Sequence, residues 1–348
     1  MNVGAKTLQK KGSWLGYGTA VAALHAAGIA SLAAVVPAHP TLLGLGLLAY
    51  TLGVRHAFDA DHIAAIDNTV RKLLQQGRNP RGVGFFFSVG HSTVVCLMAV
   101  ATALAAGWAI RAMPSLQAVG GVIGTAVSGG FLLVLGVVNL MILIQILQVF
   151  FRMRKGVNEE GRLEELLHAR GLIARLVTPL LRFVGRSWHV YPIGFLFGLG
   201  FDTASEVSLM ALSAGAGQSG LPVVGVLALP LLFAAGMSLF DTADGIFMSE
   251  AYTWAFRNPV RKIYYNLTVT GLAAAAALLI GSVELVQVVA SHLRTTSGFW
   301  TRIQELDLGS VGYVLVVLFG LAWALSYGAW KVFRIEERWA LPQDKVRD

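Results

Sequence analysis

Long apolar runs alternate with short polar links along almost the whole chain. Eight of these runs reach about 20 residues, the length that a helix needs to cross the hydrocarbon core of a bilayer. The pattern predicts an all-α integral membrane protein with about eight transmembrane helices. The predicted spans are Trp14–Val36, Leu42–Ile66, Val83–Trp108, Val119–Phe151, Val190–Ala214, Leu221–Phe247, Ile263–Ser291 and Ser310–Phe333.

The composition and the charge distribution agree with this class. Of all residues, 55% are hydrophobic and only 13% are charged, whereas a soluble domain carries about 25% charged residues. The net charge is +8, and 23 of the 27 Lys and Arg residues lie in links on one side of the predicted membrane. Because positively charged links stay in the cytoplasm, this pattern predicts cytoplasmic termini. It also indicates contact with anionic lipid headgroups rather than with nucleic acid.

One long link, residues 152–188, separates two sets of four spans, residues 1–151 and 189–348. Its stretch "NEEGRLEELLHARGLIARLV" predicts an amphipathic helix on the cytoplasmic side. Phe-Asp motifs recur in the second, fifth and sixth spans. They indicate an internal repeat, which could be direct or inverted.

The second span carries more ionisable groups than helix packing requires, in the stretch "RHAFDADHI". At about 100° per residue, a straight helix would place Arg55, Asp59 and His62 within an arc of about 60°. Asp61 falls off this arc. Either the helix is distorted, as Gly53 would allow, or Asp61 faces a different neighbour.

Two interpretations of this stretch are open. Imidazole nitrogens and carboxylate oxygens together suit divalent Ni, Co or Zn, which predicts a cation pathway. A network of ion pairs within the helix is the structural alternative. Two His and three Asp between Leu52 and Asp67 favour the pathway, because ionisable groups inside a membrane are costly and usually functional. The candidate ligands are His56, Asp59, Asp61 and His62, with Arg55 as the charge-balancing residue.

Three further spans carry groups of the same chemistry. His91 in the third span lies among Ser and Thr residues, whose hydroxyls can orient its ring. Asp202 and Glu206 in the fifth span would share one helix face, where a cation would relieve their repulsion. Asp241 and Asp244 form a similar pair in the sixth span. The rise per residue predicts that these groups meet in one layer between the midplane and the cytoplasm.

These motifs resemble those of the nickel/cobalt transporters, which are single-chain bacterial permeases with eight spans. The matching stretches are "RHAFDADHI", "FSVGHSTVV", "LGFDTASE" and "GMSLFDTAD", each in its expected span. With the eight-span pattern, the resemblance covers nearly the whole chain. It implies that His56, Asp61 and His62 are essential for transport. It also implies contributions from His91, Asp202, Glu206, Asp241 and Asp244.

The resemblance implies a high-affinity secondary transporter that imports Ni²⁺ and/or Co²⁺ across the bacterial cytoplasmic (inner) membrane. Related efflux proteins carry a His-rich cytoplasmic loop, whereas residues 152–188 contain only His168. No phosphate-binding loop of the G-x-x-x-x-G-K-[ST] type occurs in the sequence, so we do not expect the chain to hydrolyse nucleotide. We expect no cofactor, no nucleic acid and no obligate ATPase partner.

Three alternatives stay open at the level of sequence. The first is export of the same ions by the same fold. The second is a membrane-embedded metalloenzyme with a catalytic zinc, although no H-E-x-x-H pattern occurs. The third is a metal sensor or channel, which would bind the ion without concentrative uptake.

Overall fold

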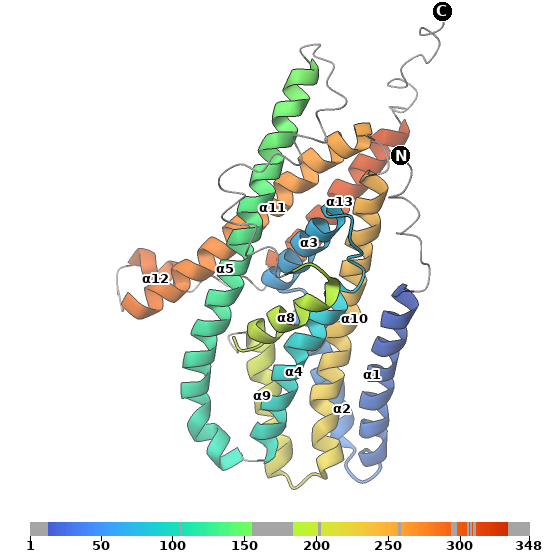
Figure 1. Cartoon of the computed structure of the whole chain (residues 1–348). Helices are drawn as coiled ribbons and strands as arrows, with labels where there is room; N and C mark the ends of the chain where they lie inside the picture. Colours follow the sequence, from blue (N-terminus) through green and yellow to red (C-terminus); the bar gives the residue numbers. More distant parts are fainter. Residues whose placement is uncertain are drawn as a thin grey trace, which may run out of the picture.

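The computed structural model describes residues 13–104, 106–154, 184–200, 203–256, 259–293, 298–304, 306, 308 and 311–332. The regular elements within these ranges are all helical (Figure 1). They are α1 (Ser13–Val35), α2 (Thr41–Ala57), α3 (Ala60–Gln75), α4 (Val83–Leu104), α5 (Ala106–Arg154), the short 3-10 helix η1 (Ser187–Val190), α8 (Tyr191–Phe197), α9 (Ala204–Gln218), α10 (Val223–Phe256), α11 (Pro259–Leu293), α12 (Gly298–Gln304) and α13 (Val311–Val332).

Five of the described helices are long and apolar enough to cross a membrane, namely α1, α4, α5, α10 and α11. Helices α2 and α3 meet the same criterion together, as one span that is bent by 54°. Helix α13 adds a shorter apolar stretch, Val311–Leu325. The chain is therefore an all-α multi-pass membrane protein, as predicted. The count of eight spans and the cytoplasmic termini stay predictions.

The predicted fifth span is not one helix. Helix α8 ends at Phe197 and α9 begins at Ala204. Thr203 has an extended backbone, and its side chain caps the N-terminus of α9. Thr is a favoured residue at this position, and the nearby Gly198 and Gly200 have low helix propensity. The prediction of a continuous helix over Val190–Ala214 is therefore wrong.

Helix α5 is longer than the predicted fourth span, because it runs for 49 residues and includes the preceding link. The amphipathic helix that was predicted at residues 158–177 lies outside the described residues. The division of the chain into two halves around this link therefore stays a prediction.

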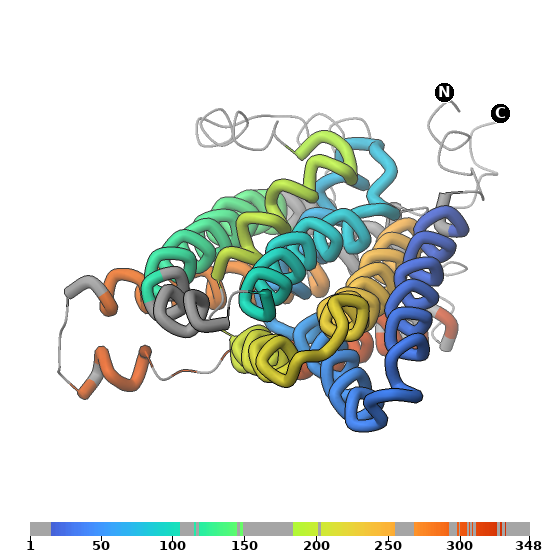
Figure 2. The backbone as a smooth tube through the Cα atoms, turned by 90° about the horizontal axis from the view of Figure 1, so that it is seen from below, coloured from blue at the N-terminus to red at the C-terminus, as the bar shows by residue number. Residues whose placement is uncertain are grey.

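Helix α10 lies inside the bundle and is in contact with helices on several sides. It packs against α1, α2, α3 and α4, and Figure 2 shows it between α1 and α4. Helix α4 packs in turn against α8 and α9. Helices α5 and α11 cross and pack against each other beside this group (Figure 1). Helices from both halves of the sequence therefore meet around α4 and α10.

Two glycines let α4 approach its neighbours closely. A Cβ atom on Gly84 would collide with the backbone carbonyl of Asp241 in α10, and one on Gly90 with that of Tyr191 in α8. Small residues at helix crossings permit this close contact between membrane helices. Because Gly90 directly precedes His91, this packing holds the backbone of His91 close to α8.

Candidate metal site

The second predicted span is broken where its ionisable residues lie. Helices α2 and α3 meet at an angle of 54°. Asp59 is the N-cap of α3, with an extended backbone (φ −67°, ψ 144°), and its side chain makes no capping hydrogen bond. The arc that a straight helix would give Arg55, Asp59 and His62 therefore does not form, and the alternative of a distorted helix is confirmed. The distortion lies at Asp59 and not at Gly53.

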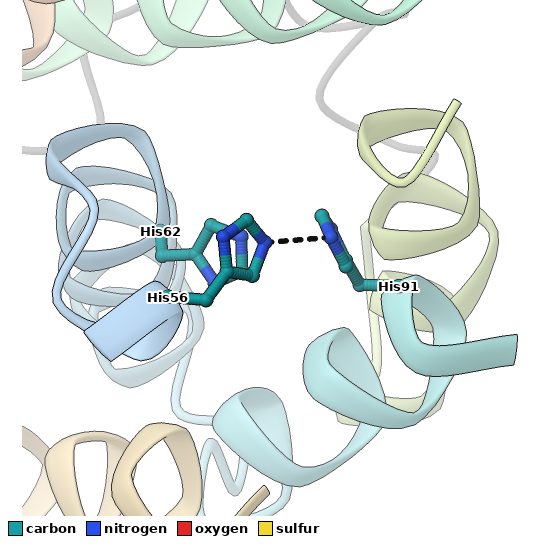
Figure 3. A group of neighbouring side chains, drawn as sticks. All are labelled: His56, His62 and His91. Carbon is teal, nitrogen blue, oxygen red and sulfur yellow. Dashed lines mark hydrogen bonds between the residues drawn. The ribbon is translucent and has the colours of Figure 1, made fainter. Parts of the chain in front are cut away.

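The bend brings three imidazoles together from α2, α3 and α4 (Figure 3). One ring nitrogen from each of His56, His62 and His91 lies within 4.8 Å of the others. The Nε2 atom of His56 lies 2.8 Å from the Nε2 atom of His91. The most exposed of the three residues, His91, is only 3% exposed. Nitrogens spaced this closely can share one transition-metal ion, whose bonds to imidazole are about 2.1 Å long.

Helix α9 adds a carboxylate to the imidazoles. Glu206 Oε1 lies 3.0 Å from His91 Nε2 and 3.8 Å from His56 Nε2. Its other oxygen, Oε2, accepts a hydrogen bond of 3.0 Å from the hydroxyl of Thr203. The break before α9 thus places a helix N-terminus, where negative charge is favoured, beside the imidazoles. Glu206 is in position to be a fourth donor.

Helix α10 supplies a second carboxylate on the other side of the cluster. Asp241 Oδ2 lies 3.4 Å from His62 Nδ1, and both side chains are 1% exposed. A buried carboxylate is stable only beside a positive charge or hydrogen-bond donors. The Asp241 carboxylate and the His62 ring can either pair with each other or bind one cation together.

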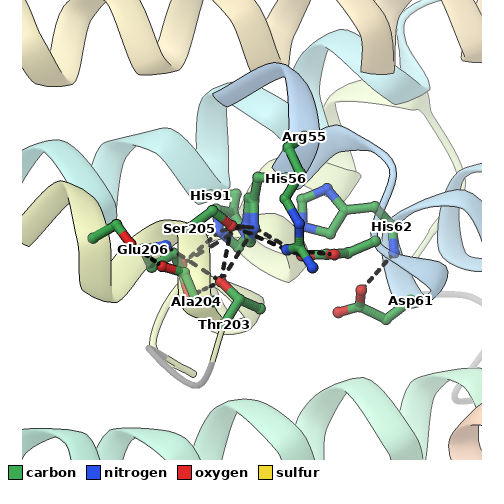
Figure 4. Close-up of polar contacts among 11 residues, drawn as sticks. Arg55, His56, Asp61, His62, His91, Thr203, Ala204, Ser205 and Glu206 are labelled. Carbon is green, nitrogen blue, oxygen red and sulfur yellow. Dashed lines mark hydrogen bonds and ion pairs between the residues drawn. The ribbon is translucent and has the colours of Figure 1, made fainter. Parts of the chain in front are cut away.

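Asp59 contacts His56 on the opposite edge of its ring. Asp59 Oδ2 lies 2.9 Å from His56 Nδ1, and Asp59 Oδ1 accepts a hydrogen bond of 3.0 Å from Arg55 Nη1. The same Arg55 nitrogen donates to Ser205 Oγ at 3.3 Å, so it links α2 to α9 (Figure 4). A carboxylate on the second nitrogen of a ligating His fixes the orientation of the ring. Asp59 is therefore placed to orient His56 rather than to bind the ion itself.

Two hydroxyl groups at the site were not predicted from the sequence. Ser205 Oγ lies 3.2 Å from His56 Nδ1, and Thr203 Oγ1 lies 3.3 Å from the same atom (Figure 4). Both residues stand in the same motif as Glu206, so a signal was present. Hydroxyl residues are also common at helix N-termini, however, and by themselves they do not indicate a site.

The remaining predicted residues occupy different positions. Asp61 is partly exposed, and its Oδ1 accepts a hydrogen bond of 2.9 Å from the backbone N–H of His62 (Figure 4). Asp244 is half-buried on α10, three residues beyond the carboxylate that contacts His62. Asp202 lies outside the described residues. The continuous helix that was expected to place it on one face with Glu206 does not form, because α9 begins after that position.

Nitrogen and oxygen donors from five helices thus converge at a buried point inside a helical membrane protein. This fold and candidate site are those of a membrane transport protein for divalent transition-metal ions. The sequence model of the NicO family, described as high-affinity nickel-transport protein, matches residues 42–328. The chain belongs to this family, whose members are transport proteins and not enzymes.

Relatives from several bacteria are similar over most of their length. The chain is 53% identical over 328 residues to the nickel transporter NixA of Staphylococcus aureus, covering 94% of this chain and 97% of the relative. It is 50% identical over 337 residues to the nickel transporter NicT of Mycobacterium tuberculosis, covering 94% and 91%. It is 44% identical over 287 residues to the cobalt transport protein NhlF of Rhodococcus rhodochrous, covering 81% of each chain. No solved structure matches this chain.

Proposed function

We propose that this chain is a high-affinity secondary transporter that imports Ni²⁺ and/or Co²⁺ through the site around His56, His62 and His91. The observation that carries the proposal is the close approach of these three buried imidazoles, within 4.8 Å of one another. Imidazole and carboxylate donors suit both ions. Relatives that are named for nickel transport and for cobalt transport support the same substrate class.

The proposed ligands come from both halves of the sequence. The three imidazoles precede residue 152, whereas Glu206 and Asp241 follow residue 188. These five side chains would replace the hydration shell of the ion inside the membrane. Asp59 orients His56, and Arg55 balances the negative charge of the site when it holds no ion.

We place the transporter in the bacterial cytoplasmic (inner) membrane, with both termini and residues 152–188 on the cytoplasmic side. The distribution of Lys and Arg residues supports this orientation. A membrane potential that is negative inside would favour entry of a cation by about 2.3 kcal/mol per charge per 100 mV. The proposal involves the lipid bilayer and the metal ion, and it needs neither nucleic acid nor an ATPase partner.

The experiment that tests this proposal is uptake of trace radioactive Ni²⁺ and Co²⁺ by cells that express the wild type or His62→Ala. His25→Ala is the matched control, because His25 is half-buried on α1 and its ring contacts Tyr50 rather than the site. Membrane levels of the three proteins are equalised, and unlabelled metals are added as competitors.

We expect accumulation in cells with the wild type and with His25→Ala, and its loss in cells with His62→Ala. The competition then ranks the ions. Accumulation below that of cells without the protein would indicate export and would overturn the import proposal. Equal accumulation by all three proteins would remove the histidine site from the mechanism.

A further inference from the structure

A second group of buried polar side chains lies between α3 and α10, beyond the histidine site. Asp67 on α3 is completely buried, five residues after His62. Asp244 on α10 lies three residues after Asp241. At 1.5 Å per residue these offsets are about 7.5 Å and about 4.5 Å. Both carboxylates are therefore displaced from the histidine site in the same direction, provided that the helices run parallel.

The contacts show that the two helices do run parallel and that the carboxyl group of Asp67 faces α10. His62 lies beside Asp241, and further along both helices the Tyr252 hydroxyl donates a hydrogen bond of 2.6 Å to Asp67 Oδ1. Asp244 interacts electrostatically with both Asp67 and Asp241. The three carboxylates thus form one series that begins at the histidine site.

Asp67 and Asp244 each keep one oxygen for which the described residues offer no hydrogen bond. Both Oδ2 atoms are buried and lack a hydrogen-bond partner in the described ranges. Leaving a charged oxygen in this state costs several kcal/mol, because the group has lost its water. Inside a membrane protein, such a group usually marks a path for ions or protons.

The buried Arg71 accounts for only part of the negative charge. It acts electrostatically on Asp67, but its guanidinium lies 5.3 Å from the centre of the Tyr252 ring and donates a hydrogen bond to Thr270. One guanidinium does not neutralise two carboxylates, and neither Oδ2 atom accepts a hydrogen bond from it in the described structure. A divalent cation between Asp67 and Asp244 would supply the charge and the contacts that these oxygens lack.

We propose that Asp67 and Asp244 form a second cation site, made of oxygen donors, which receives the ion from His62 and Asp241. Ni²⁺ and Co²⁺ bind oxygen donors less tightly than imidazole, whereas Mn²⁺ prefers oxygen. The second site therefore holds the transported ion more weakly than the first. It is a release site midway along α3, on the side of the histidine site that leads to Arg78 and Arg81 in the following link, where basic residues indicate the cytoplasm.

This inference deepens the proposed function and rests on it, so the test must separate the two. Purified full-length protein in detergent is titrated with Ni²⁺ by equilibrium dialysis, and with Mn²⁺ by electron paramagnetic resonance. The variants are Asp67→Asn, Asp244→Asn and His62→Ala. Glu250→Gln is the matched control, because its carboxylate lies on the same α10 helix but is exposed and pairs with Arg81 at 2.8 Å.

We expect the wild type and Glu250→Gln to bind two Ni²⁺ ions, the second about tenfold or more weakly, and one Mn²⁺ ion. Asp67→Asn and Asp244→Asn should lose the Mn²⁺ ion and the weaker Ni²⁺ ion but keep the tighter one. His62→Ala should lose the tighter Ni²⁺ ion and keep Mn²⁺. In cells, Asp67→Asn should lower the maximal rate of Ni²⁺ uptake more than it changes the half-saturating concentration.

A wild type that takes up Ni²⁺ and binds it tightly, but binds no Mn²⁺ and only one Ni²⁺, would overturn the second site alone. A wild type with neither tight binding nor uptake would overturn the proposed function. If Asp67→Asn folds less stably yet keeps both ions, the role of Asp67 is structural and the inference is wrong. If that variant does not fold, the wild-type Mn²⁺ measurement still decides.

Discussion

The rings of His56 and His91 face each other through their Nε2 atoms, which lie 2.8 Å apart on helices α2 and α4. Two nitrogens at this distance cannot both carry a proton between them. Either one proton is shared, or both nitrogens are free to donate to a cation. Protons and the metal ion therefore compete for the same two atoms.

This competition predicts that Ni²⁺ binding weakens as the pH falls. Histidine normally gains its proton between about pH 8 and pH 5, and a protonated nitrogen cannot bind the metal. We therefore expect the dissociation constant of the tight Ni²⁺ site to rise between neutral and mildly acidic pH. Equilibrium dialysis of purified protein at several pH values measures this directly. An unchanged dissociation constant would argue against imidazole ligands.

Replacing Arg55 by Leu should impair uptake, because this guanidinium joins Asp59 to Ser205 across α2 and α9. Without it, Asp59 loses the hydrogen bond from the guanidinium and keeps only its contact with His56, so the orientation of the His56 ring relaxes. Changes of this kind usually reduce metal affinity by about 10–100-fold. Uptake kinetics of Arg55→Leu and Arg55→Lys measure the effect, and the Lys variant should retain part of the activity. Normal uptake by Arg55→Leu would reject the role of Arg55.

Substitutions of Asp61 and Glu206 should have different effects, although the family motifs include both residues. One should change the rate of uptake, and the other the affinity for Ni²⁺. Glu206 lies 3.0 Å from an imidazole nitrogen, so Glu206→Gln should weaken Ni²⁺ binding to the purified protein. Asp61 instead accepts a hydrogen bond from the backbone at the start of α3. Asp61→Asn should therefore slow uptake, because the first turn of α3 loses a stabilising contact. The equilibrium affinity for Ni²⁺ should change by no more than about twofold, because Asp61 is not among the proposed ligands. Equal losses of affinity would place Asp61 among the ligands.

Gly84→Ala should separate α4 from α10, because its Cβ atom would meet the backbone carbonyl of Asp241. Overpacking of this kind costs about 1–3 kcal/mol, and here it also displaces a proposed ligand. We expect a lower melting temperature and reduced Ni²⁺ uptake. Gly44→Ala on α2 is the matched control, since a Cβ atom there has no neighbour within 4 Å. Normal behaviour of Gly84→Ala would show that α4 can shift without harm.

The sequence was sufficient to predict the helical membrane fold, since apolar runs of this length have few other solutions. It left a distorted second span open but did not indicate that the break lies between α2 and α3, because no Pro or Gly stands next to Phe58 and Asp59. The break is stabilised by contacts with residues far away in the sequence, which a local sequence pattern does not show. The Phe58 ring stacks on Tyr313 at 5.0 Å, and the absence of a side chain at Gly312 lets α13 reach the Phe58 backbone.

The site was predictable in its chemistry but not in its geometry. The three imidazoles, Glu206 and Asp241 were all named from their residue types and motifs, and the structure brings them together. The separate role of Asp59 became visible only with its contact to the far nitrogen of His56. Asp67 was counted among the ionisable residues of this stretch but was not named as a site residue, because in the sequence it directly follows the predicted span.

The broken helices also affect how the loaded and empty molecules differ mechanically. Each break leaves a short segment, at Asp59 or at Thr203, whose backbone is extended rather than helical. An ion bound to donors from α2, α3, α4, α9 and α10 would act as a reversible cross-link between these segments. The bundle would then be more rigid while the ion is bound and more flexible after the ion leaves. The transported ion would thus contribute to the stability of the conformation that binds it.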